Sequence, residues 1–573
     1  MLLYNLTFPR KDICGEQELY FRGGTLRGDS VYVNNGGRLT FDTYFNCFSH
    51  SRYKKYTTVN EVAFRLDVVG RGVLSLYRFA DGADSLIVSS QIDSGGEVRA
   101  DINSIPDGGF IYAAFEACGD SVIKSGGWYA NGIAAGDVRI GIVICTYKRE
   151  QYLRRNIANL TEYRRSLNDN CFFDVFVVDN GRTLTDDFGD GIRLIPNENT
   201  GGSGGFTRGI AEVCATGEYT HFLLMDDDIL FDVNTLSRTA TLLSVLADEY
   251  NDASVGGAML VLDKPYLQEE MGADWTGNSI RSRRRKIDAR LRETICGNED
   301  QDEPDYNAWF YMCMPISAMQ KYGYPLPLFI RCDDVEYGLR AAQHVITSSG
   351  IAVWHESFDN KYSAALEYYT KRNELIVSAR YPRGKGAFAN WIKLVAAVGK
   401  QLVQQRYFAV NLIFKAYADF FKGPQYLANM DSEKSHAAIS SLGPRLLDVD
   451  ELKNEFDIDV DLNQINRVTQ RKIKAKNVLT LNGYFLPKCF YKKGVAQVDM
   501  AARFELDSFY LKKRVLHFCP ATGKGFVTDI KKSELWKAGF RLVGYFFKMM
   551  FAYRAVAKKY SKFEFIPHYD TRL

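Results

Sequence analysis

The stretch "VRIGIVICTYKRE", residues 138–150, joins an apolar run to a polar turn, and the helix-like segment 152–167 follows it. Buried strands followed by helices build parallel α/β sheets. The unit recurs, because apolar runs also lie in the segments 173–181, 192–215 and 220–230. We therefore predict a mostly parallel, Rossmann-like sheet whose ligands bind beyond the carboxyl ends of its strands.

The sequence on either side of this region has different patterns. Short alternating runs such as "SVYVNN" and "GFIYAAFEA", separated by Gly, Asp and Asn turns, are typical of an antiparallel β-sandwich of jelly-roll or carbohydrate-binding type. The last third of the chain is helical in pattern, lysine-rich and aromatic. We predict an α/β protein with an added all-β domain: an N-terminal β-sandwich over 1–137, a central α/β domain over 138–384 and a C-terminal helical domain over 385–573.

Size and composition exclude several classes of protein. A chain of 573 residues with 46% hydrophobic content can bury a large core, and its 72 basic and 69 acidic side chains leave a formal charge of +3. This near balance provides no basic field for a nucleic-acid partner. The 11 cysteines show no zinc or disulfide spacing, and no signal sequence or membrane span is recognisable, so we expect a reducing, cytoplasmic location.

Two C-terminal segments, 388–423 and 534–563, combine apolar faces with lysine and arginine. Such segments can lie in a membrane interface. Core-facing helices of a small domain explain the same pattern. The sequence therefore leaves peripheral membrane contact open as one of two interpretations.

Three consecutive aspartates, Asp226, Asp227 and Asp228, follow the apolar run of the segment "THFLLMDDDILF" (220–231). Each like-charge pair costs about 4 kcal/mol at a separation of about 4 Å, so either full solvation or a divalent cation must offset the repulsion. Side chains alternate along an extended segment, so the first and third aspartates can share one cation while the second points elsewhere. His355 follows another apolar strand in "IAVWHES", and two carboxylates with an imidazole are compatible with Mn²⁺.

Polar residues also follow the other predicted strands. Arg149 follows the first strand and Asp179 ends the second, and such a pair can hold a nucleobase and a ribose. The third strand leads into a glycine-rich turn that starts at Asn199. That turn either lets backbone N–H groups approach an anion or is only a tight entry to a helix.

A second acidic cluster lies in "PLFIRCDDVEYGLR", which contains Asp333, Asp334 and Glu336. Acidic residues in the first turn of a helix are common as caps and dipole partners. A carboxylate here would also suit a general base that activates a hydroxyl, because a nearby negative charge raises its basicity.

The combination of these motifs resembles a known enzyme family. The Asp triplet, "NTGGSGGFTRG", "CDDVEYGLR" and "VWHES…YYTKRNELI" are similar to the family 2 inverting glycosyltransferases, and specifically to the polymerising galactofuranosyltransferases of bacterial cell-wall galactan. The resemblance covers most of the chain, with a β-sandwich, a GT-A domain and a helical region in the same order. It implies a GT-A fold for the central domain.

The resemblance implies a role for each donor-side residue. Arg149 and Asp179 would contact the uridine half of UDP-galactofuranose, with Asn199 beside them and Asp227 in the same substrate site.

The same resemblance assigns the metal and the chemistry. Asp226, Asp228 and His355 would hold a divalent metal, Mn²⁺ or Mg²⁺. Asp334 would be the catalytic base, and Asp333 would bind or orient sugar hydroxyls. The implied reaction is a direct displacement with inversion at the anomeric carbon.

Some positions depart from the family pattern or allow two interpretations. The family has tandem tryptophans where this chain has Ala308-Trp309, and tryptophans in place of Cys332 and Phe358. Trp309 is either an acceptor-stacking residue or part of the core. The run "RSRRRK" (281–286) is either a solvated charged segment or a contact for the pyrophosphate of a lipid-linked acceptor or for an anionic membrane.

Together these observations predict a metal-dependent inverting glycosyltransferase that moves galactofuranose to a growing, lipid-linked bacterial surface glycan. The expected location is the inner face of the cell membrane, and the resemblance implies a homo-oligomer. Three alternatives are an enzyme for another nucleotide sugar, a carbohydrate-binding or assembly protein with an inactive transferase domain, and a nucleotidyltransferase, whose product would be pyrophosphate.

Overall fold

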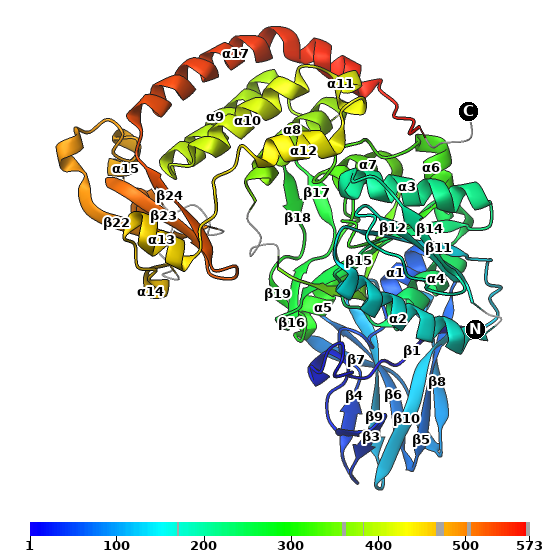
Figure 1. The fold of residues 1–573 in the computed structure, drawn as a ribbon. Helices are drawn as coiled ribbons and strands as arrows, with labels where there is room; N and C mark the ends of the chain where they lie inside the picture. The colour runs from blue at the N-terminus through cyan, green and yellow to red at the C-terminus, as the bar shows by residue number, and fades with distance from the viewer. Residues whose placement is uncertain (169–170, 358–362, 382, 466–474, 501–505, 569–573) are drawn as a thin grey trace.

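The protein is a mixed α/β chain built in three consecutive parts. Figure 1 shows the β-sandwich at one end, the central sheet with its helices in the middle, and the C-terminal helices with a small sheet beyond them. The computed structural model describes residues 1–168, 171–357, 363–381, 383–465, 475–500 and 506–568. Among these residues no helix is both long and apolar enough to cross a bilayer.

The N-terminal part is the predicted sandwich. Its six-stranded sheet has the order β2-β3-β10-β5-β8 with β1 paired to β10, and the facing four-stranded sheet has the order β4-β9-β6-β7. Trp128 is fully buried in this core, and its indole Nε1 donates to the carbonyl of Asn46 at 3.1 Å. The elements are β1 (Leu2–Asn5), β2 (Thr25–Arg27), β3 (Ser30–Val33), β4 (Arg38–Thr40), α1 (His50–Tyr56), β5 (Glu61–Val69), β6 (Arg71–Ala80), β7 (Ala83–Asp93), β8 (Gly96–Asp101), β9 (Phe110–Ala117) and β10 (Ser121–Ala130).

The central part is built on a nine-stranded sheet of order β13-β12-β11-β14-β20-β15-β16-β19, with β21 paired to β15. Strands β11 to β14 are parallel to one another, and β20 runs antiparallel between β14 and β15. The strands are β11 (Ile140–Thr146), β12 (Phe173–Asp179), β13 (Ile192–Pro196), β14 (His221–Asp226), β15 (Ser254–Val261), β16 (Lys264–Glu270), β19 (Ile287–Asp288), β20 (Tyr311–Pro315) and β21 (Val345–His355). A separate hairpin pairs β17 (Ala273–Trp275) with β18 (Ile280–Ser282).

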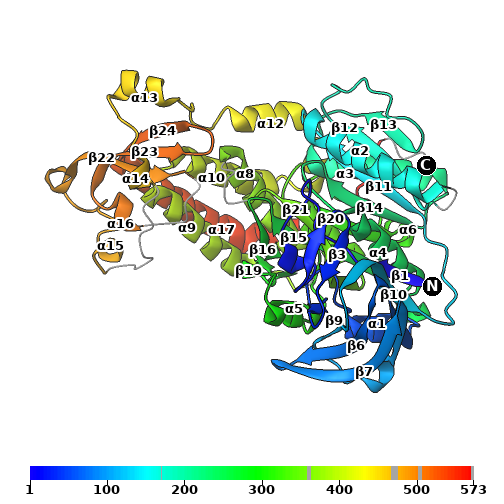
Figure 2. The same cartoon turned by 90° about the horizontal axis from the view of Figure 1, so that it is seen from below.

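Helices cover both faces of this sheet, as expected for a sheet with near-continuous apolar strands. Alternate residues of β11 point to opposite faces, so Ile142 packs with the α2 side and Val143 with the α3 side. The α2 side shares one continuous core with the sandwich, where Phe45 and Trp354 contact each other with ring centroids 5.4 Å apart. The helices are α2 (Glu150–Leu167), α3 (Gly201–Thr216), α4 (Val233–Ser244), α5 (Arg292–Glu299), α6 (Ile316–Tyr322) and α7 (Asp333–Ala341). Both α1 and α5 pack against β9 (Figure 2).

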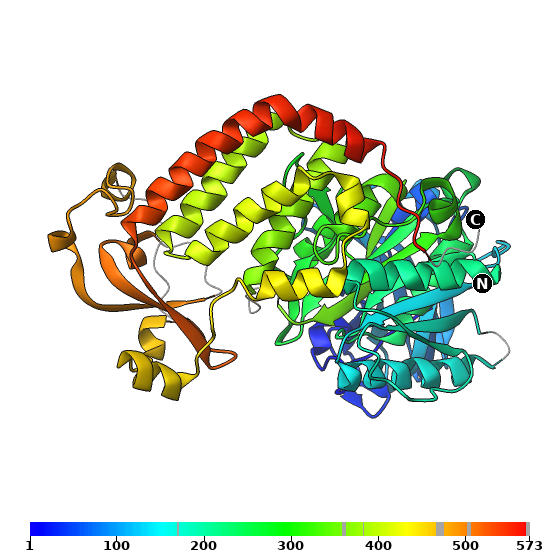
Figure 3. The same ribbon diagram turned by 45° about the horizontal axis from the view of Figure 1, so that its top comes forward.

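The C-terminal part contains a helical bundle and a sheet that the sequence analysis did not predict. Helices α8, α9, α10 and α17 pack on one another, and α17 runs along the outer side of α9 (Figure 3). The predicted boundary at 384 falls between α8 and α9. The helices are α8 (Ala364–Arg380), α9 (Ala387–Val403), α10 (Tyr407–Phe420), α11 (Pro424–Ala428), α12 (Ser432–Ser440), α13 (Val449–Phe456), α14 (Leu462–Ile465), α15 (Ala475–Leu479), α16 (Leu506–Phe509) and α17 (Lys532–Ser561).

The predicted C-terminal helical domain therefore also contains a three-stranded sheet. Strand β22 (Lys492–Asp499) pairs in parallel with β23 (Lys512–Cys519), and β23 pairs antiparallel with β24 (Lys524–Asp529). These strands are short and begin with lysines, so their alternating apolar residues are a weaker signal than the long amphipathic runs around them.

Candidate active site

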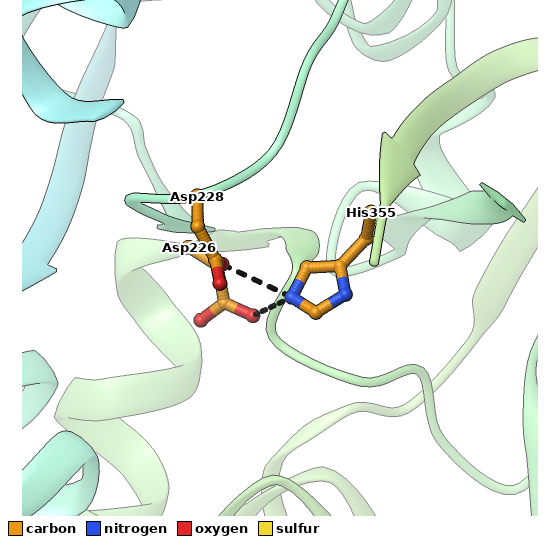
Figure 4. A group of neighbouring side chains, drawn as sticks. All are labelled: Asp226, Asp228 and His355. Atoms are coloured by element: carbon orange, nitrogen blue, oxygen red, sulfur yellow. Dashed lines mark ion pairs between the residues drawn. The ribbon is translucent and has the colours of Figure 1, made fainter. Parts of the chain in front are cut away.

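Three potential metal ligands meet at the carboxyl ends of two strands. Asp226 is the last residue of β14, Asp228 lies two residues further on, and His355 is the last residue of β21. Their ligand atoms lie within 4.8 Å of one another. His355 Nε2 is 3.0 Å from Asp228 Oδ1 and 4.0 Å from Asp226 Oδ2 (Figure 4). Two carboxylate oxygens and one imidazole nitrogen form a donor set that suits Mn²⁺.

The orientation of His355 is fixed from its other ring nitrogen. Nδ1 lies 2.6 Å from the carbonyl oxygen of Glu356, so Nδ1 carries the proton and donates to it. Nε2 therefore faces the carboxylates. Burial alone would lower the pKa of His355. The hydrogen bond to Asp228 and the negative charge of Asp228 oppose burial, and the net effect is a raised pKa.

Asp227 lies in the turn that follows β14 and bonds a different strand end from Asp226 and Asp228. Its carboxylate accepts a hydrogen bond from Thr146 Oγ1 at 2.7 Å. Arg149 Nη1 lies 3.4 Å from Asp227 Oδ1 and 2.5 Å from Asp228 Oδ2, so one guanidinium joins two of the three aspartates. Burial raises the pKa of Asp227 to about 6 despite the Thr146 bond.

Asp226 is the most accessible of the three, with 37% of its side chain exposed. Desolvation is the largest influence on it and raises its pKa to about 6, because His355 only partly compensates and Asp228 adds repulsion. A divalent cation placed between the two carboxylates would favour their charged forms. Metal binding and proton release are therefore coupled at this site.

The second acidic cluster begins helix α7. Burial raises the pKa of both Asp333 and Asp334, and their mutual repulsion raises the pKa of Asp333 further. Asp334 Oδ1 accepts the N–H of Val335 at 2.8 Å. Glu336 has a different role, because its buried carboxylate bonds Arg340 Nε at 2.8 Å and therefore serves the structure.

The residues predicted for the nucleotide side form the adjoining loops. Asp179 is 1% exposed, and its carboxylate accepts the N–H groups of Gly181, Thr183 and Leu184 at 2.7–2.8 Å. Its visible role is to shape the loop after β12. The side chain of Asn199 accepts the N–H of Gly201 at 3.2 Å.

The glycine-rich turn is shaped by close packing. Gly201 has φ +70°, and a Cβ there would lie 2.1 Å from the carbonyl oxygen of Phe329. The N–H of Ser203 donates to the same oxygen at 3.1 Å. One N–H in the first turn of α3 is thus already bonded to the loop that precedes α7. Of the two interpretations of this turn, the structure supports the tight helix entry.

Comparison with known proteins decides the family. A model described as Galactofuranosyltransferase 2 N-terminal matches residues 18–131, and a model of glycosyl transferase family 2 matches residues 141–299. Galactofuranosyltransferase GlfT2 of Mycobacterium tuberculosis is 29% identical over 449 residues, which is 70% of this chain and 67% of that protein. Its counterpart in Mycolicibacterium smegmatis is 29% identical over 437 residues, covering 70% and 66%. The chain is a glycosyltransferase that contains a family 2 domain over residues 141–299.

Solved structures resemble this family 2 glycosyltransferase only distantly. Mannosyltransferase PcManGT from Pyrobaculum calidifontis, in complex with GDP-Man and Mn²⁺, has 13% identity and a TM-score of 0.28, covering 54% of this chain and 83% of its own. Mannosyl-3-phosphoglycerate synthase from Rubrobacter xylanophilus has 10% identity and a TM-score of 0.25, covering 42% and 73%. At these TM-scores the likeness supports no conclusion about the site.

A further buried carboxylate, which the sequence analysis did not single out, interacts electrostatically with Asp334. Glu270 ends β16, where burial, together with repulsion from Asp334, raises its pKa to about 7 although Ser282 opposes the shift. Its neighbour Glu269 faces the other way and pairs with Arg285 at 2.5 Å. The sequence of two adjacent glutamates in a short strand does not predict which of the two faces a site.

Trp309 lies in the core of the enzyme. It is 5% exposed, and its ring meets Phe206 and Tyr337 edge to face at centroid distances of 5.3 and 6.2 Å. Of the two interpretations of Trp309, its burial and these ring contacts support a core residue. Phe358 lies outside the described residues.

The arginine run of 281–286 is also used inside the protein. Arg281 and Arg283 both bond the carboxylate of Asp274, at 2.7 and 2.6 Å. Arg284 donates to the carbonyl of Thr294 at 3.1 Å. These bonds hold Arg283 and Arg284 within the protein, whereas 70% of the Arg281 side chain stays exposed.

Proposed function

We propose that this enzyme is a metal-dependent inverting transferase that moves galactofuranose from UDP-galactofuranose to a hydroxyl of a growing, lipid-linked glycan. The observation that carries the proposal is the convergence of Asp226, Asp228 and His355, together with the raised-pKa pair Asp333 and Asp334 in the first turn of α7. The galactofuranosyltransferase relatives supply the sugar in this proposal.

The residues divide the chemistry between them. A divalent cation held by Asp226, Asp228 and His355 would neutralise the departing diphosphate. Asp334 accepts the proton of the attacking hydroxyl, and its raised pKa makes it a better base than an exposed aspartate. Arg149, held between Asp227 and Asp228, lies beside the metal ligands and fixes their arrangement. Displacement from the opposite face then inverts the anomeric carbon.

The proposal is tested by measuring UDP release from a panel of UDP-sugars, with Mn²⁺ or EDTA, and a synthetic lipid-linked galactose acceptor. We expect release only with UDP-galactofuranose and metal, with growth of the acceptor by mass spectrometry. Release from another UDP-sugar would replace the donor and keep the mechanism. Pyrophosphate as the product would identify a nucleotidyltransferase, and no turnover with any donor would favour the binding-protein alternative.

We also propose that the enzyme contacts an anionic lipid surface through α17. Five large apolar side chains of this helix are 54–83% exposed and follow one another at helical spacing. We call them the apolar stripe of α17: Trp536, Phe540, Val543, Phe547 and Phe551.

The stripe faces outward because the opposite face of α17 packs against the helical bundle. Residues such as Met549 and Tyr553 on that face are buried in the bundle. The charged side chains of α17 are basic, with the exception of Glu534. An exposed apolar stripe with basic neighbours suits the interface of an anionic membrane. Cytoplasmic location and a homo-oligomeric state remain predictions.

A further inference from the structure

One motif of the sequence has no part in the proposed chemistry: "YYTKRNELI" (368–376), which lies in α8. Its Asn373 is completely buried. The side-chain Nδ2 of Asn373 donates to three carbonyl oxygens, those of Leu328 at 3.1 Å, Ile330 at 2.9 Å and Arg331 at 2.8 Å. A single amide thus binds most of the loop 328–332, which leads directly into Asp333 and Asp334.

This loop has a strained backbone. Phe329, Arg331 and Cys332 have φ values of +72°, +68° and +60°. The left-handed conformation costs residues with side chains roughly 1–2 kcal/mol each, and it persists only where surrounding groups impose it. The loop therefore depends on bonds from outside itself for its shape.

The neighbouring Arg372 fixes which way the amide of Asn373 points. Arg372 Nε donates to Asn373 Oδ1 at 2.9 Å, which turns the NH₂ group of the amide toward the carbonyls. Arg372 Nη2 also donates to the carbonyl of Leu328 at 2.8 Å. The guanidinium lies over the rings of Tyr368 and Tyr369, at 5.2 and 5.3 Å from their centroids, so it has little freedom to move.

The opposite side of the loop is held by α3. Ser203 N–H donates to the carbonyl of Phe329 at 3.1 Å, and Ser203 Oγ donates to the carbonyl of Leu326 at 2.6 Å. Phe329 stacks on Tyr369 of α8 with a centroid distance of 5.0 Å. The loop is thus clamped between the glycine-rich entry of α3 and helix α8.

We propose that Asn373 is a positioning residue for the transfer step, oriented by Arg372. Its amide holds the loop 328–332 in its strained shape, and this shape sets where Asp334 stands relative to Asp226 and Asp228. The inference rests on the proposed function, in which Asp334 is the base. Misplacing a reacting group by about 1 Å can cost about 100-fold in rate, so this clamp affects turnover more than donor binding.

The variant Asn373→Asp tests the role because it keeps the size of the side chain and removes the NH₂ donor. We expect kcat per folded protein to fall about 10–100-fold, while the donor KM and the calorimetric affinity for UDP with Mn²⁺ stay within about twofold. Arg372→Lys is a milder second variant, which loses the bond that orients the amide and should show a smaller kcat loss of the same kind.

The matched control is Asn390→Asp in α9. Asn390 is also a buried asparagine, 1% exposed, whose amide donates to Ser378 Oγ, Lys385 O and Gly386 O at 3.1, 2.7 and 3.2 Å. A purely structural role predicts the same behaviour for both asparagines: lower thermal stability and unchanged kcat per folded protein.

Three outcomes separate this inference from the proposed function. An unchanged kcat in both Asn373→Asp and Arg372→Lys overturns the positioning role, as does a fall no larger than that of Asn390→Asp. If Asp334→Asn, assayed alongside, keeps full turnover, the proposed base is wrong. An inactive Asp334→Asn with a fully active Asn373→Asp would overturn the positioning role alone.

Discussion

Asp334 differs from the other acidic residues of its helix in what its carboxylate can do. Glu336 is bound by Arg340, whereas Asp334 accepts the backbone N–H of Val335, and burial raises its pKa to about 6. Asp334→Asn keeps the shape and removes the base, so we expect turnover to fall roughly 10²–10⁴-fold while UDP-sugar binding persists. Single-turnover kinetics with calorimetry of donor binding measures both. Glu293→Gln in α5 is a control outside the site, and unchanged turnover in Asp334→Asn would refute the assignment.

Asp226 links stability to pH and metal. Its pKa in the folded chain is raised to about 6. Between about pH 4 and about pH 6 the folded chain therefore holds a proton that the unfolded chain has released. The metal-free protein loses stability as pH rises through this range. Bound Mn²⁺ would replace that proton. A ligand present at 100 times its Kd stabilises the folded state by about 2.7 kcal/mol. We expect Mn²⁺ to raise Tm more at about pH 7.5 than at about pH 5.

Thermal unfolding with Mn²⁺ or EDTA at both pH values gives this comparison. Asp226→Asn should lose most of the metal-dependent rise in Tm, and a change at the exposed Asp137 should not affect it. An equal rise at both pH values, or a full rise in Asp226→Asn, would contradict the assignment of Asp226 as a metal ligand.

At the scale of elements, the contact between α3 and the loop before α7 depends on Gly201. Gly201→Ala would place a Cβ 2.1 Å from the Phe329 carbonyl, in addition to the strain of φ +70°. Gly217 ends the same helix with φ +69° and has no atom within 4 Å of its Cβ position. Gly217→Ala should cost about 1–2 kcal/mol, and Gly201→Ala should cost more and also lower kcat. Denaturant unfolding and kinetic assays compare the two variants. Equal losses of stability would show that the close approach of Gly201 to the Phe329 carbonyl is unimportant.

The same element scale explains what the sequence could predict. The sequence indicates the strand ends because buried runs such as that of β14 stop at charged residues, so it also predicts the grouping of Asp226, Asp228 and His355. Asn373 was not recognisable, because its three partners are backbone carbonyls of a loop more than 40 residues earlier in the chain. The sequence gives the chemical type of each side chain, whereas the path of a left-handed loop depends on the groups that surround it in the folded protein.

At the scale of the whole molecule, each of the three parts supports the candidate active site in a different way. The sandwich shares a core with one face of the central sheet, so it supports the strands whose ends carry the proposed metal ligands. The bundle contributes α8, which clamps the loop before α7 from the other side. The catalytic region is thus held from both ends of the chain, and changes in the bundle can alter turnover without touching a substrate.

The outermost element, α17, gives the last prediction. If its apolar stripe enters a membrane interface, the purified protein should float with anionic liposomes, and added salt should weaken the association because it screens the basic side chains. Phe540→Ser with Phe551→Ser removes the two most exposed rings of the stripe, at 77% and 83%, and should leave the protein at the bottom of the gradient. Leu86→Ser, which removes a 58% exposed leucine from the sandwich, should float like the unaltered chain. Flotation of the double variant would show that the stripe is not the membrane contact, and an unaltered chain that stays at the bottom would refute lipid binding itself.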